Sequence, residues 1–346
     1  MELGKKIRQL RFKAGLTQEQ LADKLGIGAQ SVSKWENAVA MPDITTLPLL
    51  AEVFGVTIDD LFDLTKEQRL NRIENRMDAE EELPADIFRE FESFLLSELK
   101  DEENGKRATE LIAYLYWHRM NAESKKAARY AKEAILRAPG EKGCQWILNK
   151  ADNHAVWDWN LRNHSRAVAF WREVAEANPG IALPYMYLLD NLIADHRADE
   201  AERWLERYCT LEKAHPVMKR VYRAYIALAR FDEPTADRIM EELLAEQPEN
   251  DAVLFEIAQY YAAKADYAKA VECYERAFAA DRQRPRFTDT LMGIKDIYEI
   301  MGDYANAAKT CDRMLELLEN EWGLSEETDS SVTAAKKEKA RLLAKA

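Results

Sequence analysis

A small residue recurs through the last two-thirds of the chain at a nearly constant interval. The residue is alanine, and the successive intervals are 40, 34, 35, 34 and 37 residues. The six positions are Ala127, Ala167, Ala201, Ala236, Ala270 and Ala307. An alanine is required where two paired helices cross closely, because a larger side chain there would cost about 1–3 kcal/mol. Since a repeat of this length accommodates one pair of helices, the recurrence predicts a helical array.

Composition also favours an all-α fold. Glycine supplies only 12 of the 346 residues, about half of its usual share of roughly 7%, which argues against a turn-rich β fold. No apolar run of about 18 residues occurs, so we expect no membrane span. The start of the chain lacks the apolar stretch of a secretory signal. The four cysteines stand far apart, as in reduced proteins without a disulfide or zinc framework. We therefore expect a cytoplasmic protein.

Charge is unevenly distributed along the chain. The net charge is −13, yet residues 1–40 carry seven basic and four acidic residues, a net of +3. Residues 66–346 hold a net of −11. A short basic segment on an acidic body is typical of a protein that presents one face to nucleic acid.

The basic segment has the pattern of several short helices. Leu3, Ile7 and Leu10 predict a first helix over residues 2–14. Thr17 and Gln20 form a capping-box pattern that opens a second helix. A third helix is expected over residues 29–36, with Val32 and Trp35 buried. Two more helices are expected after the third. One carries a single apolar stripe of Ile44, Leu47, Leu50, Ala51 and Phe54, and the next covers residues 56–62.

These residues resemble the Cro/cI-type (XRE) helix-turn-helix family of phage and bacterial regulators. The resemblance covers about 65 residues and rests on Ile7-Arg8, Leu10-Arg11, Gly15 to Ala22, Leu25-Gly26, Ser31 to Asn37, Pro42 and Leu61-Phe62. It implies a five-helix, lambda-repressor-like domain over residues 1–65 whose third helix enters the major groove of DNA. By the same resemblance, Ala29, Gln30, Ser33 and Lys34 face the bases, and Gln18 and Asn37 hold phosphates. Arg11 and Glu36 would form an ion pair between the first helix and the end of the third.

The chemistry of two of these residues supports the resemblance. The Gln30 amide can bond adenine with two hydrogen bonds, and Lys34 can donate to O6 and N7 of guanine. A good bidentate pair discriminates by about 1–3 kcal/mol. Ala29 offers at most an apolar contact to a thymine methyl. Gly28 stands where the family usually has a serine or threonine cap, and glycine is a fair substitute.

The array resembles tetratricopeptide (TPR) repeats, whose period is 34 residues. The fifth unit is the clearest, with Leu254, Ile257, Ala258 and Tyr261 on one helix and Tyr267, Ala270, Tyr274 and Ala277 on the next. We expect about six units over residues 105–322, forming a right-handed α-solenoid with a concave groove for a peptide or a partner helix. A purely structural or dimerising array is the alternative. Pro139, Pro179, Pro248 and Pro285 fall near unit ends.

Two segments flank the array. Residues 66–104 predict a helical linker, with helices over 66–79 and 85–99 separated by Pro84. Its apolar residues would either start the solenoid or form a dimer contact; they are Ile87, Phe88, Phe91, Phe94 and Leu95. Residues 323–346 are expected to be a polar tail, loose from Ser325, or a capping helix.

Other signals are weaker. Aromatic residues concentrate in the first two units, where we expect rings to fill wide gaps between helices, with a hydrophobic pocket as the alternative; they are Tyr114, Tyr116, Trp117, Tyr130, Trp146, Trp157, Trp159, Phe170 and Trp171. Asn149, Asn153 and Asn160 share one helical face, where they would bond a peptide backbone or simply be solvated. Cys273 and Cys311 are expected to be core thiols. The five histidines lack metal-ligand spacing.

We expect a non-enzymatic protein without a cofactor or metal, because no phosphate loop, nucleophile elbow or acid/base set occurs. The sequence predicts a homodimeric transcriptional regulator that binds a double-stranded DNA operator and senses a peptide or protein through its array. The domain order resembles the peptide-responsive regulators of Gram-positive bacteria. A protein-interaction scaffold is the alternative function. A third possibility is a DNA-binding regulator without a ligand.

Overall fold

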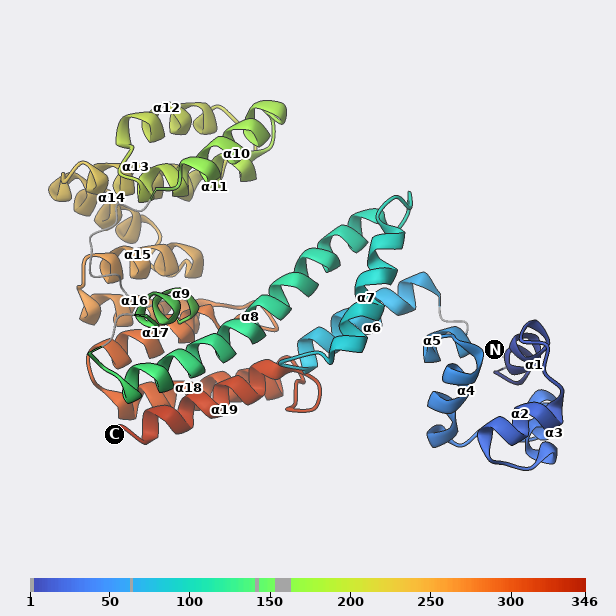
Figure 1. Cartoon of the computed structure of the whole chain (residues 1–346). Coiled ribbons are helices and arrows are strands. Elements are labelled where there is room, and N and C mark those ends of the chain that lie inside the picture. The colour runs from blue at the N-terminus through green and yellow to red at the C-terminus, as the bar shows by residue number, and fades with distance from the viewer. Residues whose placement is uncertain (1–2, 63–64, 141–142, 153–162) are drawn as a thin grey trace. The chain divides into compact units, whose positions relative to one another are not determined.

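The fold is all-α. The computed structural model describes residues 3–62, 65–140, 143–152 and 163–346, and within these ranges it contains helices and no strands. Contacts divide the chain into two compact units, the first ending at Glu133 and the second beginning at Ala134. An N-terminal helix-turn-helix is followed by helical repeats (Figure 1).

The first five α-helices build the N-terminal part of the first unit. They are α1 (Leu3–Lys13), α2 (Gln18–Leu25), α3 (Ala29–Glu36), α4 (Leu47–Phe54) and α5 (Ile58–Leu61), with the short 3-10 helix η1 (Ile44–Thr46) before α4. Their buried core includes Ile7, Leu21, Val32, Leu50 and Leu61. The prediction for Ile44 is wrong: its side chain is 78% exposed, because the α-helical stripe begins only at Leu47.

The segment after the first five helices has a core of its own. Helices α6 (Lys66–Ala79) and α7 (Ala85–Glu98) follow the predicted spans, and Pro84 caps α7. Phe88, Phe91 and Leu95 pack with α6 and with the first half of α8 (Gly105–Arg137). Of the apolar residues predicted to pack, Phe88, Phe91 and Leu95 are thus buried within the chain, and Ile87 and Phe94 are partly buried.

The first predicted repeat unit is wrong. Residues 105–137 form one 33-residue helix, α8, and Ala127 lies within it, so the unit has no second helix of its own. The physical reason is visible in the sequence, since no glycine or proline follows Gly105 before the helix ends.

Four complete helix pairs form the regular part of the second unit (Figure 1). The pairs are α11 (Ala182–Ala194) with α12 (Ala198–Cys209), α13 (Pro216–Ala229) with α14 (Glu233–Glu246), α15 (Asp251–Ala263) with α16 (Tyr267–Ala280), and α17 (Asp289–Ile300) with α18 (Tyr304–Asn320). The second helix of every pair carries its recurring alanine fully buried, at Ala201, Ala236, Ala270 and Ala307. This confirms the packing role predicted for these four. Helices α9 (Gln145–Ala151) and α10 (Ser165–Ala177) precede these pairs. Ala167 lies on α10 and is only half-buried.

The end of the chain is a docked helix and not a loose tail. Helix α19 (Ser330–Leu343) buries Val332 and Ala335 beside Leu318 of α18. Arg341 donates to both Glu299 carboxylate oxygens, at 2.7 and 2.6 Å. Because α18 would otherwise expose an apolar face, α19 serves as the cap of the array.

The prediction that large aromatic rings fill gaps between helices is wrong for five of them. Tyr116, Trp117, Tyr130, Trp146 and Phe170 are 49–62% exposed, so they do not fill gaps between helices. Trp171 is half-buried and stacks on Tyr187 with ring centroids 4.6 Å apart. Trp157 and Trp159 lie outside the described residues. By contrast, Cys273 and Cys311 are buried free thiols, as predicted, and burial raises the pKa of both.

Enlarging a recurring alanine should destabilise the array. We expect Ala270→Leu to lower the free energy of unfolding by about 1–3 kcal/mol, because Ala270 is fully buried between α15 and α16. Chemical denaturation of the full chain measures the effect. Ala279→Leu is the matched control, since Ala279 is exposed on the same helix. Equal stability of both variants would contradict close packing at Ala270.

Candidate DNA-binding surface

Local signals define the beginning of α2 and the turn between α2 and α3. At the beginning of α2, Thr17 Oγ1 accepts the Gln20 backbone N–H at 3.1 Å, and the Gln20 side chain accepts the Thr17 N–H at 2.9 Å, which confirms the capping box. Gly26 ends α2 in the left-handed conformation with φ 65°, a conformation that glycine adopts without strain. Gly28 begins α3 without a side-chain cap.

Helix α3 is held against α1 by a backbone contact. A Cβ atom added to Gly4 would lie 1.9 Å from the Trp35 carbonyl oxygen. Only glycine permits this approach. Val32 and Trp35 bury the same side of α3, at 0% and 6% exposure. One face of α3 is thus fixed in the core and the opposite face remains outside.

A buried ion pair ties the two helices together, as the family resemblance implied. Arg11 Nε donates to Glu36 Oε1 at 2.6 Å, and Arg11 Nη2 donates to Oε2 at 2.9 Å. Arg11 Nη1 also donates to the Leu16 carbonyl at 2.8 Å. Gln18 Nε2 donates to Glu36 Oε2 at 2.8 Å. This network satisfies the carboxylate and fixes the beginning of α2 relative to the end of α3.

Acid should weaken this network. Burial alone would raise the pKa of Glu36, but the hydrogen bonds from Arg11 and Gln18 outweigh burial and lower it. A depressed folded-state pKa stabilises the fold above the unfolded value of about 4.3, and the contribution is lost as pH falls through the folded pKa. We expect the stability difference between the native chain and Glu36→Gln to shrink from pH 7 to pH 3 in thermal melts. A constant difference would contradict this.

The outer face of α3 presents the residues implied to contact bases. Gln30 and Lys34 are exposed and lie one helical turn apart, and Ala29 and Ser33 are half-buried beside them. Gln18, Ala29, Gln30 and Ser33 border one depression of about 700 Å³ between α3 and the start of α2. Their roles toward DNA stay predictions.

The two implied phosphate ligands already have intramolecular partners. Asn37 Nδ2 donates to the Ser33 carbonyl at 2.9 Å and closes the end of α3. Gln18 uses one amide hydrogen on Glu36, and the second hydrogen of the same amide is left for a phosphate oxygen. Intramolecular bonding therefore orients both side chains and is compatible with the implied contacts.

Two residues of this surface were not predicted. Phe12 is 61% exposed and borders the depression, and the Arg11 guanidinium lies 4.5 Å from its ring centroid. Gly4 makes the close approach to Trp35. The sequence signal for Gly4 was a glycine inside a helix, which is unfavourable unless another backbone passes close by.

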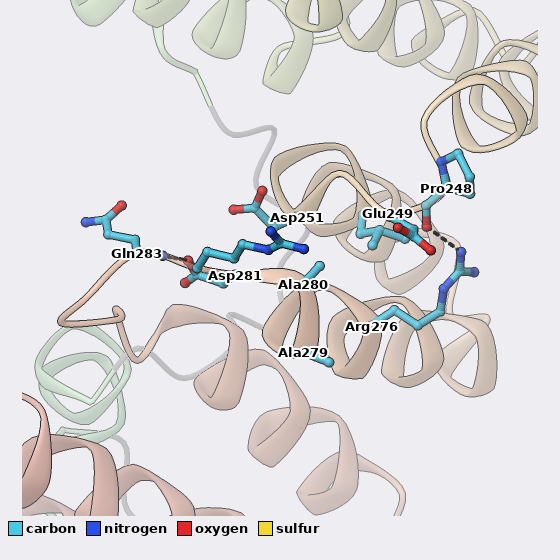
Figure 2. A pocket seen from close by; sticks show the side chains of 10 residues that line it. Pro248, Glu249, Asp251, Arg276, Ala279, Ala280, Asp281 and Gln283 are labelled. Carbon is cyan, nitrogen blue, oxygen red and sulfur yellow. Dashed lines mark hydrogen bonds between the residues drawn. The ribbon is translucent and has the colours of Figure 1, made fainter.

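The structure describes only one of the three asparagines predicted to bind a ligand on the array. Asn149 is half-buried on α9, whereas Asn153 and Asn160 lie outside the described residues. Figure 2 shows a separate depression of about 690 Å³ at one end of the α15–α16 pair. There Arg276 donates to the Pro248 carbonyl, and the Gln283 N–H donates to Asp281, both at 2.8 Å. These bonds hold the loops that flank the pair.

None of the described helices is both long and apolar enough to cross a membrane. In the same part of the chain, no group of three or more His, Cys, Asp or Glu residues could hold a metal ion.

Comparison with known proteins identifies the N-terminal domain. The helix-turn-helix family model HTH_3 matches residues 6–61. The HTH-type transcriptional regulator ImmR of Bacillus subtilis (strain 168) is 31% identical over 103 residues, which make up 30% of this chain and 72% of ImmR. The chain belongs to the helix-turn-helix transcriptional regulators. The regulator is also 40% identical over 76 residues to the HTH-type transcriptional activator BcrR of Enterococcus faecalis. That match covers 22% of the regulator and 37% of BcrR, little more than a third of the latter.

Similarity to a solved structure extends over more of the regulator. PlcR of Bacillus thuringiensis, crystallised in complex with the peptide PapR7 and DNA, is 16% identical with a TM-score of 0.26. The match covers 84% of the regulator and 96% of the PlcR chain.

Proposed function

We propose that this regulator binds an operator in double-stranded DNA by placing α3 in the major groove. One observation carries the proposal: Gln30 and Lys34 are exposed together on a helix whose opposite face is buried. An amide and an ammonium group are side chains that bond adenine and guanine edges. The Arg11–Glu36 pair keeps α3 in a fixed orientation, so these two groups are presented without further ordering.

Binding to random duplex DNA at two salt concentrations tests this proposal. Protein groups that contact phosphates release counterions, so affinity must fall as salt rises. Affinity that does not change with salt would exclude DNA binding through this surface. It would favour the alternative of a protein-interaction scaffold.

The helical repeats supply the proposed sensor and dimerisation region. Four pairs of helices stack through buried alanines, and arrays of this kind expose long surfaces suited to a peptide or a partner helix. In the proposed homodimer, a ligand on the array shifts the population of array conformations and thereby changes the spacing of the two DNA-binding domains. Their half-sites would lie about one helical turn apart, near 34 Å.

Thermal melts of the full chain with synthetic peptides test the sensing step. A ligand present at 100 times its dissociation constant adds about 2.7 kcal/mol to stability. Salt-dependent DNA binding with no change in the melts across a broad peptide library would leave a regulator without a peptide ligand.

A further inference from the structure

Two carboxylates on the repeats differ from the acidic residues around them. Asp190 lies on α11 and Glu256 on α15, and among the described residues neither has a lysine or arginine within ion-pair distance. Several other acids of the array do have such partners: Glu200 meets Arg172 and Arg197, Asp237 meets Lys264, and Glu275 meets Arg313. We call Asp190 and Glu256 the carboxylate pair.

Three of the four cations on the neighbouring first helices are bonded to other groups, and the fourth, Arg223, lines a separate depression. Lys219 on α13 donates to the Cys209 carbonyl at 3.0 Å, and Arg220 donates to Glu246. Arg223 lines a depression with residues of α12 and α14, and Lys295 on α17 pairs with Asp296 and Glu338. The carboxylate pair therefore remains uncompensated in the unliganded chain.

Tyrosines surround the carboxylate pair. Tyr222 on α13 is 3% exposed, and its hydroxyl donates to Asp190 Oδ1 at 3.0 Å. Tyr225, one turn further along α13, is half-buried and packs edge-on against Tyr260. Because α13 contacts both α11 and α15, these rings lie between the helices that carry Asp190 and Glu256.

Tyr274 adds an unused polar group. Only 6% of Tyr274 is exposed, and within the described residues its hydroxyl has no hydrogen-bond partner. The ring tip occupies the space beside Gly293 on α17, where an added Cβ would lie 2.8 Å from Cζ and 3.1 Å from the hydroxyl. Burial and the neighbouring Glu256 and Asp296 carboxylates raise the pKa of Tyr274 to about 12. Its hydroxyl thus stays protonated, and Glu256 is the first of the carboxylates whose charge acts on it.

Uncompensated carboxylates in such surroundings oppose folding. Burial raises the pKa of Glu256, and the charge of Asp190 raises it further. The helices around Asp190 desolvate its carboxylate and raise its pKa, although the residue is exposed and the Tyr222 hydrogen bond acts in the opposite direction. An acid whose folded-state pKa is raised lowers stability at neutral pH. The half-buried Glu256 charge is therefore unfavourable in the unliganded chain, the exposed Asp190 charge adds to it, and a cation from outside the chain would relieve both.

We propose that the carboxylate pair, with Tyr222, Tyr225 and Tyr274, binds a basic side chain of the peptide sensed by the repeats. A guanidinium group matches this arrangement, because it bonds carboxylates and also stacks on aromatic rings. This inference rests on the proposed peptide-sensing function and specifies the chemical class of the peptide.

Two peptide pools test the proposal on the full chain. Both contain seven residues with a fixed centre and randomised flanks; the centre is arginine in one pool and its neutral isostere citrulline in the other. Seven extended residues span about 23 Å, the width of about three packed helices. Affinity selection should retain arginine peptides in preference to citrulline peptides. Glu256→Gln and Asp190→Asn should each weaken binding of a selected arginine peptide about tenfold or more.

Controls separate this claim from folding effects. Glu316→Gln removes the same charge from an exposed site on α18 and should leave peptide binding unchanged. Glu256→Gln should also raise the melting temperature at pH 7 while it weakens binding, since the amide removes an unfavourable charge. A merely structural carboxylate would give the opposite change in melting temperature.

The possible failures are distinguishable. If neither pool contains a binder, peptide sensing itself is wrong, and the inference falls with it. If peptides bind but arginine and citrulline are retained equally, or Glu256→Gln binds as the native chain does, the sensing function stands and the basic side chain is wrong.

Discussion

Replacing Arg11 with alanine should lower the stability of the α1–α3 region by about 3–5 kcal/mol. The reason is the charge left behind. Glu36 is 7% exposed and would keep only the Gln18 amide as a side-chain partner. An unpaired buried carboxylate costs more than the pair contributes, since both charges of the intact pair were already compensated.

Hydrogen exchange of the full chain, resolved to peptides from α1 and α3, measures this loss directly. Lys13→Ala is the matched control, because Lys13 is exposed on the same helix, does not act on Glu36 and should change exchange little. The double variant Arg11→Met/Glu36→Leu should recover most of the stability, since it removes both charges. A loss below about 1 kcal/mol for Arg11→Ala would be the value of a solvent-exposed pair, and would contradict the buried network.

Gly4→Ala should be the second severe substitution. In an exposed helix this change would stabilise by about 0.5–1 kcal/mol, because glycine is a poor helix former. Here the new Cβ would lie 1.9 Å from the Trp35 carbonyl oxygen, so α1 and α3 must separate. Overpacking costs typically about 1–3 kcal/mol, and a clash with backbone lies at the upper end of that range or beyond it. The cost of overpacking therefore exceeds the gain in helix propensity, and Gly4→Ala should destabilise the protein.

The same exchange measurement applies to Gly4→Ala. Gly28→Ser is a suitable control because a Cβ at Gly28 meets nothing within 4 Å, and serine is a slightly better cap than glycine. Faster exchange in α1 and α3 for Gly4→Ala, with no such change for Gly28→Ser, is expected. Unchanged exchange for Gly4→Ala would mean that the two backbones are not in contact.

Much of the N-terminal domain was predictable because its signals are local. The Thr17–Gln20 capping box, the glycine after α2 and the apolar spacing of Val32 and Trp35 define helices without reference to distant residues. The Arg11–Glu36 pair came from the family resemblance, and its partners are 25 residues apart. The Gly4 contact was missed, since a backbone-to-backbone approach leaves no trace in the sequence beyond the glycine itself.

The array was predictable in its regular part and not at its start. The buried alanines of α12, α14, α16 and α18 repeat because each occupies the same crossing. Ala127 was placed in the series by sequence alone, at a longer interval of 40 residues, yet it lies within one long helix, because no residue near it stops helix propagation. The carboxylate pair was not found from the sequence, since Asp190 and Glu256 are separated by two repeats and neither belongs to a recognisable motif.

Selection of bound sequences from a random pool of duplex DNA shows whether the outer face of α3 contacts bases. The native chain, Gln30→Ala, Lys34→Ala and the control Lys24→Ala, which changes an exposed lysine on α2, would be compared at one salt concentration. We predict that the native chain and Lys24→Ala select the same operator. Gln30→Ala and Lys34→Ala should lose preference at the positions they contact, by up to about 1–3 kcal/mol for the bidentate Gln30 amide and by less for Lys34, which is a point donor. Selection of the same operator with equal preference by all four proteins would contradict the account.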